Sequence, residues 1–283
     1  MLHGTGVSTE ALTPVDKGDD VLVAIRSIRS PRLACSIATL GATLALWYVC
    51  TSVTGVVGPA RLPAPLDVWQ AFLQVAGEGY ADGRLDQHIL QSVKLVLYGF
   101  FAAAVTGVPL GLWMGQSRRA QAFFNPIFVM LRPIPPLAWI PLAIVWLGLG
   151  DAAKIMVIWF AAFVPCVINS FAGVRNLDPA LIEAADMLGL RRAQFVREVM
   201  IPGALPMIYT GLRLSLQASW TTLVAGELIG AVRGLGHLLT QGSLDIFPAM
   251  IVVAMLSVAL CGWLMTVLLG QLENRSMPWR AKR

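Results

Sequence analysis

Residues 178–206 read DPALIEAADMLGLRRAQFVREVMIPGALP, the longest charged segment between two strongly apolar stretches of the chain. Asp178-Pro179 is typical of a helix start, because Asp accepts hydrogen bonds from the first turn and Pro is preorganised there. Gly189 suits the position after a helix where the chain turns. A second short helix over about 191–200 is expected to end before Pro202, since the residue preceding a proline disfavours helical angles. The pattern predicts two short helices joined at a glycine, and spacing alone leaves open an ordinary loop packed on its own spans.

The rest of the chain has the composition of a membrane protein. Of its 283 residues, 57% are hydrophobic and only 13% are charged, against roughly 25% charged in soluble domains. Several apolar runs exceed the ~18 residues that cross a bilayer. A backbone within lipid must form helices or a closed barrel. Apolar and polar residues alternate along barrel strands, whereas these runs are continuously apolar. We therefore predict an all-α membrane protein.

About six spans are expected, with a polar tail at each end. A proline-rich elbow and a surface helix should follow the first span. The predicted segments are a tail at 1–32, the first transmembrane helix at 33–60, an elbow and connector at 61–94, a transmembrane core at 95–270 that includes the loop at 175–206, and a basic tail at 271–283. Within the core, the third span, at about 123–149, should be broken, because proline removes a backbone donor and clashes one turn back. The prolines that break it are Pro133, Pro135, Pro136 and Pro141.

The basic residues predict an orientation. Six spans put both termini on one side; with that side as the cytosol, 14 of the 21 Lys and Arg lie inside and 5 outside. The opposite topology would contradict the positive-inside rule. We expect both termini and the loop at 175–206 to be cytoplasmic, and the net charge of +5 to reflect this bias instead of nucleic-acid binding. The four cysteines and three histidines lack the spacing of a metal site.

The loop resembles the EAA loop of bacterial ABC-importer permeases. In that family the pattern is E-A-A, three residues, G, nine residues, I-x-L-P; the spacing here is the same, with conservative departures at the first and third positions of the last group. The residues that carry it are Glu183, Ala184, Ala185, Gly189, Val199, Ile201 and Pro202. RPIPPLAWIPL at 132–142 and GELIGA at 226–231, followed by GLG, are similar to the nitrate, sulfonate, taurine and bicarbonate branch. The resemblance covers roughly residues 60–275.

The resemblance implies a type I importer permease with a MetI-like fold in the bacterial inner membrane. Two copies would pair, each docking its loop on one of two cytoplasmic ATPase subunits, and an extracytoplasmic binding protein would deliver a small anion such as a sulfonate, taurine or nitrate. Bicarbonate, a pyrimidine-like compound or an aromatic acid are alternatives. The chain is not expected to be an enzyme, because it offers too few His, Asp and Glu residues near the interface for a catalytic site. It is not expected to hydrolyse ATP either: no lysine follows a glycine, so a P-loop is absent, and ATP with Mg²⁺ would bind the partner ATPase.

Polar side chains within the apolar runs are candidates for the translocation path. Charges in a span cost at least ~2.5–3.5 kcal/mol at the bilayer centre, so they call for a function or a partner. The candidates are Arg132, Arg213, Ser215, Gln217, Ser219, Thr222 and Glu227. The alternatives are that the arginines extend to the inner interface, that the neutral residues bond between helices, and that Glu227 caps or gates the outer end. A secondary transporter remains a further hypothesis, but it predicts inverted repeats, and the single broken helix has no evident counterpart.

Overall fold

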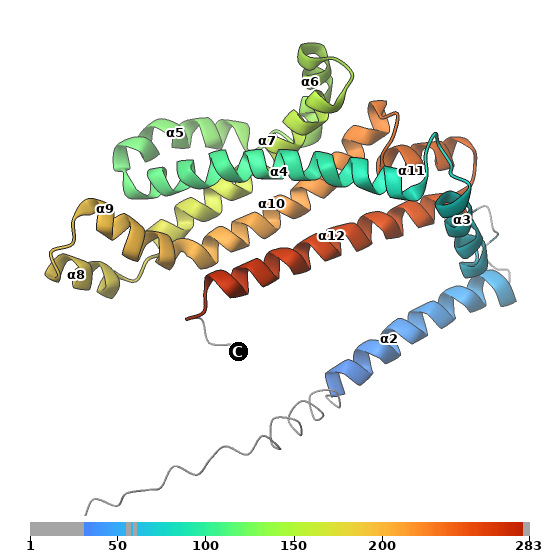
Figure 1. The fold of residues 1–283 in the computed structure, drawn as a ribbon, viewed down its shortest axis with the longest axis horizontal. Coiled ribbons are helices and arrows are strands. Elements are labelled where there is room, and N and C mark those ends of the chain that lie inside the picture. Colours follow the sequence, from blue (N-terminus) through green and yellow to red (C-terminus); the bar gives the residue numbers. More distant parts are fainter. Residues whose placement is uncertain (1–30, 55–57, 59–60, 280–283) are drawn as a thin grey trace, which may run out of the picture. The chain divides into compact units, whose positions relative to one another are not determined.

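The structure is a computed structural model that describes residues 31–54, 58 and 61–279 (Figure 1). The chain divides into two units, residues 1–58 and 59–283, each taken by itself. In the first, α2 (Pro31–Tyr48) continues into a π-helical turn, η1 (Val49–Val53). The apolar stretch Cys35–Val53 is long enough to cross a membrane, as predicted for the first span. The predicted tail at 1–32 lies almost wholly outside the described residues.

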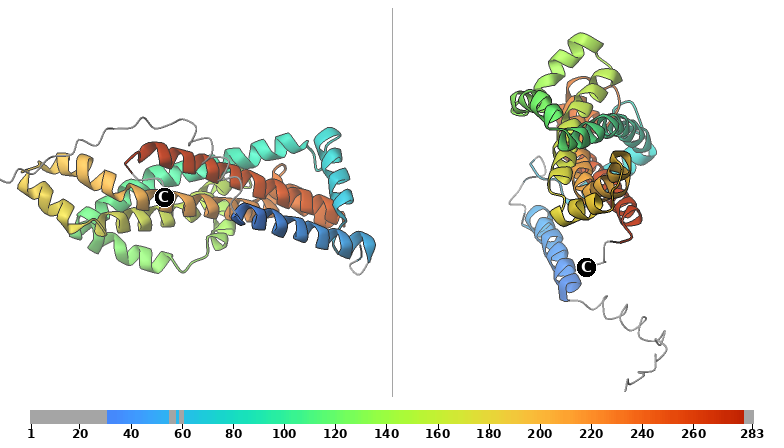
Figure 2. Two further views of the ribbon diagram at one scale, coloured as in Figure 1. Left: turned by 90° about the horizontal axis from the view of Figure 1, so that it is seen from below. Right: turned by 90° about the vertical axis from the view of Figure 1, so that its left-hand side faces the viewer.

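The second unit is helical throughout its regular structure, within the residues described. Its long helices α4, α7, α10 and α12 run side by side, with α8 and α9 at one end and α3 and α11 at the other (Figures 1 and 2). In chain order the elements are α3 (Pro65–Gly77), α4 (Leu85–Gln116), α5 (Arg118–Leu131), η2 (Pro136–Trp139), α6 (Ile140–Leu147), α7 (Asp151–Arg175), α8 (Pro179–Met187), α9 (Arg192–Gln194), η3 (Phe195–Met200), α10 (Ile201–Gly230), α11 (Leu235–Leu244) and α12 (Pro248–Ser276).

Glycines bring α4 and α7 into close contact. A Cβ added at Gly99 would lie 2.4 Å from Ile158 Cγ2, and one added at Gly111 would lie 2.4 Å from the Val167 carbonyl oxygen. Small residues allow helix backbones to approach in membranes, where packing replaces the hydrophobic drive between helices. The shortest contact at Gly111 is to backbone, so no rotamer change relieves it. This pair of helices is the centre of the unit.

The predicted break in the third apolar stretch is confirmed. The α5 helix and the segment 136–147 are bent by 87° where they meet. Pro135 is extended, at φ −63° and ψ 137°, because Pro136 follows it and disfavours helical angles at the residue before. Gly115 approaches Val174 at one end of the unit, whereas α7 begins at the other. The bent pair therefore carries the chain across, and the described part of the chain has five unbroken candidate spans and this sixth one.

Two connectors are more helical than predicted. The α4 helix begins at Leu85, well before the expected start at 95, because its buried face already includes Leu85 and His88. The second is the glycine-rich stretch 230–242, which the sequence suggests as a connector before the last span; it contains α11, where Leu235 and Leu238 are fully buried. Gly234 precedes α11 at φ +140°, in a region that suits glycine and few other residues. The glycines of this stretch argue against a helix, but the burial of its leucines stabilises α11.

Candidate functional site

The α8 helix of the loop is closed at both ends. The Asp178 carboxylate accepts a hydrogen bond from the Ala180 N–H at 2.9 Å. At the other end, Gly189 has φ +62°, and the Leu190 N–H donates to the Ala185 carbonyl at 3.3 Å. A left-handed glycine with this hydrogen bond is the Schellman ending of a helix. The predicted helix start and glycine turn are both confirmed, and they fix the shape of the loop.

The second helix does not end before Pro202, which corrects the prediction. The segment Arg192–Leu228 is continuous over 37 residues and includes α9, η3 and most of α10. Immediately before the proline, η3 is π-helical, and the Ile201 N–H donates to Val196, five residues back. Such a widened turn tolerates the missing N–H of Pro202 near the start of α10. The loop is therefore joined to a spanning helix with no intervening linker.

The outer face of α8 exposes large apolar side chains. Met187 is 90% exposed, Leu188 77% and Leu181 50%. Glu183 is also exposed, and within the described residues its carboxylate has no hydrogen-bond or ion-pair partner. Ala185 faces inward at 3% exposure. Exposed apolar patches that are rimmed by polar groups mark interaction sites. Of the other motif residues, Ala184 and Gly189 are exposed, whereas Val199, Ile201 and Pro202 are partly buried where α10 begins.

The candidates for the translocation path separate into two groups. Ser215 is fully buried and donates to the Ala162 carbonyl at 2.6 Å, and Ser219 donates to the Ser215 carbonyl at 2.8 Å. Thr222 and Glu227 are also buried. Ser215 therefore bonds to α7, Ser219 bonds back to its own helix, and all four side chains are buried inside the protomer. Arg132 is exposed at the end of α5, away from the groove described next.

Arg213 and Gln217 line a groove between α10 and α12. The groove has a volume of about 530 Å³ and is also lined by Trp220, Thr221 and, on α12, Trp263. Arg213 forms an ion pair with Glu273 of α12. The sequence analysis did not single out Trp220 or Glu273. The helical spacing of 213, 217, 220 and 221 places all four on one face, which is the signal that marks Trp220.

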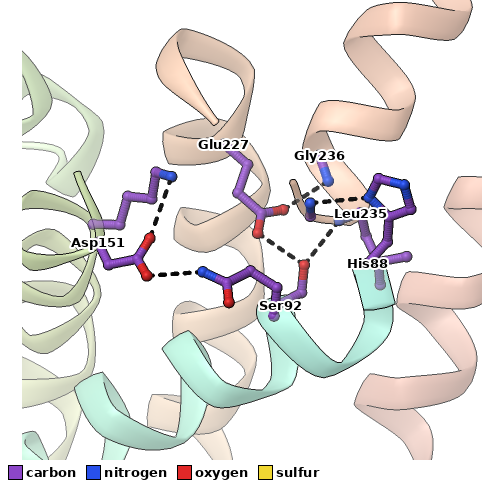
Figure 3. Close-up of polar contacts among 9 residues, drawn as sticks. His88, Ser92, Asp151, Glu227, Leu235 and Gly236 are labelled. Atoms are coloured by element: carbon purple, nitrogen blue, oxygen red, sulfur yellow. Dashed lines mark hydrogen bonds and ion pairs between the residues drawn. The ribbon is translucent and has the colours of Figure 1, made fainter. Parts of the chain in front are cut away.

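A buried polar network fixes the segment after α10 (Figure 3). This segment lies at the end of the unit opposite the loop (Figure 1). The Glu227 carboxyl is 1% exposed and accepts from Ser92 Oγ at 2.8 Å and from the Gly236 N–H at 2.7 Å. Ser92 in turn accepts from the Leu235 N–H at 2.8 Å. His88 Nδ1 accepts from the Gly234 N–H at 3.1 Å. Glu227 therefore joins α10, α4 and the start of α11.

The sequence analysis missed Ser92 and His88. They lie four residues apart on α4 and so share one of its faces. His88 Nε2 contacts the Tyr80 carbonyl oxygen at 3.0 Å. Because Nδ1 accepts, the ring proton is on Nε2, and the neutral imidazole ties the connector at Tyr80 to the same network. A polar pair at this spacing in an apolar helix was the available signal.

Comparisons with known proteins agree with this architecture. Residues 107–278 match the family described as binding-protein-dependent transport system inner membrane component. The chain is 36% identical over 254 residues to the taurine transport system permease protein TauC of Escherichia coli, covering 89% of this chain and 92% of that protein. It is 31% identical to the nitrate import permease protein NrtB of Synechocystis, covering 90% and 93% respectively.

A third relative and a solved structure complete the comparison. The putative aliphatic sulfonates transport permease protein SsuC of Bacillus subtilis is 32% identical and covers 84% of each chain. Among solved structures, an inward-facing MetNI methionine ABC transporter superposes with a TM-score of 0.58 at 21% identity, covering 68% of this chain and 95% of that one. The latter likeness is one of fold and confirms the predicted MetI-like architecture. The chain is a multi-pass membrane protein and belongs to the family of inner membrane components of binding-protein-dependent transport systems.

Proposed function

We propose that the chain is the permease subunit of an ATP-driven importer and forms the path for a small oxyanion such as a sulfonate, taurine or nitrate. The relatives named for taurine, aliphatic sulfonates and nitrate support this range of ligands. An ATPase on separate chains would bind ATP and Mg²⁺, and an extracytoplasmic binding protein would deliver the anion. Two copies of the permease would enclose the path, with both termini and the loop at 175–206 in the cytosol.

The observation that carries the proposal is the exposed apolar face of α8. Met187 and Leu188 are among the most exposed large apolar side chains of the described chain, yet they lie on a helix whose ends are both hydrogen-bonded. A fixed helix with unburied apolar side chains suits insertion into a cleft of a partner protein. Because the next helix continues into α10, movement of a docked partner would reach the membrane directly. ATP would then shift the permease between states by its differential affinity for them.

Introduction of a negative charge on α8 tests the docking. We expect Met187→Glu to remove ATP hydrolysis from the complex purified with the full chain in mild detergent, because a carboxylate in an apolar contact loses hydration without gaining a partner. Arg118→Glu is the matched control, since it adds a carboxylate at the start of α5, beside the same end of the unit. The M187E variant with wild-type ATP hydrolysis and wild-type uptake would overturn the proposal.

Replacement of Glu183 separates docking from folding. The Glu183 carboxylate has no partner within the described residues, so Glu183→Gln should leave thermal stability unchanged. If the carboxylate binds the ATPase by charge-assisted hydrogen bonds, the same variant should lower uptake per ATP hydrolysed. Loss of thermal stability without loss of coupling would assign Glu183 to the fold and not to the partner.

A further inference from the structure

The groove between α10 and α12 contains a cation with unused donors. The Arg213 side chain is 49% exposed, whereas its partner Glu273 is only 11% exposed. A guanidinium has five N–H donors, and within the described residues Glu273 is the only group that accepts from Arg213. Charged side chains in spanning helices face the bundle interior or a water-filled cavity. The groove is mostly apolar, Arg213 is the one charged side chain among the described residues that line it, and the free side of the guanidinium lies along it.

Trp220 supplies a second donor that lacks an acceptor. The residue is 6% exposed and lines the same groove, yet its indole N–H has no hydrogen-bond partner among the described residues. Its Nε1 is shielded from solvent and lies 3.9 Å from the position of a Cβ at Gly262, so the indole packs between α10 and α12. Buried indole N–H groups ordinarily have a partner, and leaving one unpaired lowers stability. An acceptor that entered between α10 and α12 beside Arg213 would pair with this N–H.

The charge that lines the groove favours an anion. Among the described residues that line the groove, Arg213 is a cation and none is acidic. Gln217, exposed between Arg213 and Trp220 on the same face of α10, adds an amide donor. A volume of about 530 Å³ lies in the usual range of small-molecule sites. Three donors of this kind, arranged along two turns of helix, match the several acceptor oxygens of a sulfonate.

We propose that Arg213, Gln217 and Trp220 form a binding station for a small oxyanion, and that Glu273 is a built-in competitor for Arg213. With the groove empty, the ion pair neutralises the guanidinium. An arriving anion takes the place of Glu273 or shares Arg213 with it, and the carboxylate recaptures Arg213 when the anion leaves. The proposal rests on the proposed function, because it identifies the contacts of the anion along its path.

Equilibrium binding to the full chain in lipid nanodiscs tests the station. The probe is methanesulfonate, and dimethyl sulfone, which is neutral and of similar shape, is the ligand control. We expect Arg213→Gln to weaken binding at least about tenfold and Trp220→Phe about three- to tenfold, as for loss of a charged and a neutral hydrogen bond respectively. Glu273→Gln should tighten binding severalfold, because it removes the competing carboxylate.

Arg275→Gln is the matched variant: it removes a cation from the last turn of α12 at an exposed position outside the groove, and it should bind like the wild type. Tighter binding by the E273Q variant cannot arise from misfolding, so it separates competition from a structural role. The station is overturned if the wild type binds methanesulfonate no better than dimethyl sulfone, if R213Q binds like the wild type, or if E273Q binds more weakly. Each of these results leaves the docking test at Met187 unaffected, so the two proposals fail separately.

Discussion

Removal of the Glu227 carboxyl should release the segment after α10. In the Glu227→Ala variant the Ser92 hydroxyl and the Gly236 N–H, at 2.8 and 2.7 Å from the carboxyl oxygens, lose their acceptor inside the protein. Each unsatisfied buried donor costs about 1–3 kcal/mol, so the free energy of opening this segment should fall by about 2–6 kcal/mol. Since 1.4 kcal/mol is a factor of ten, the open population should rise at least about 30-fold.

Trypsin cleavage after Arg233 measures that population. Arg233 is exposed, and its Nε donates to the Asp82 carbonyl at 3.1 Å. Cleavage therefore requires the segment to break its contacts and detach from the rest of the unit. When reclosing outpaces cleavage, the rate follows the open fraction. In the Glu227→Gln variant the cleavage rate should rise far less. The amide oxygen can still accept from the Gly236 N–H, and the amide nitrogen can donate to a lone pair of the Ser92 hydroxyl. Cleavage of E227A within threefold of the wild type would refute the network, and Glu198→Ala, an exposed change at the opposite end, is the control.

Three further predictions concern packing, pH and the loop. Gly111→Ala should lower the free energy of unfolding by about 1–3 kcal/mol, since its Cβ would meet the Val167 carbonyl at 2.4 Å; an unchanged melting temperature would contradict the close approach of α4 and α7. Burial lowers the pKa of His237 below its usual value, so acidification from pH 7.5 to 5.5 should protonate the unfolded chain first and reduce stability; His237→Gln should flatten that dependence in thermal melts. Gly189→Ala meets no atom within 4 Å, so its cost should be the left-handed backbone alone, about 1–2 kcal/mol, and Gly189→Asn should recover part of it in chemical denaturation.

The elements that were predictable from the sequence depend on local chemistry. Asp178 before a proline and Gly189 after a run of helix formers determine the ends of α8 within a few residues of chain. Pro135 and Pro136 break the third stretch for equally local reasons. The continuity of the helix past Pro202 was not predictable in this way, because it depends on the π-helical turn before the proline, and no residue pattern at 195–200 specifies that turn.

The outcome for polar residues in the spans depended on tertiary packing. Ser215 and Gln217 are two positions apart in one apolar run, yet one bonds to α7 and the other faces a groove. Only the placement of α7 and α12 around α10 distinguishes them. In the same way, the sequence places Glu273 in a charged tail, whereas in the structure it lies on α12 and forms an ion pair with Arg213. The sequence contained a face shared by 213, 217 and 220, but not the helix opposite it.

The long helix α10 has a mechanical consequence. At ~1.5 Å per residue its 30 residues extend for about 45 Å; η3 joins it to the loop at one end, and Glu227 lies near the other. A rigid tilt of about 10° around its midpoint would displace each end by roughly 4 Å, given that length. A displacement of this size breaks a hydrogen bond. The segment 231–236 must therefore move with the helix or lose its hydrogen bonds to Glu227. Motion on one side of the membrane is thus converted into a choice between two arrangements on the other.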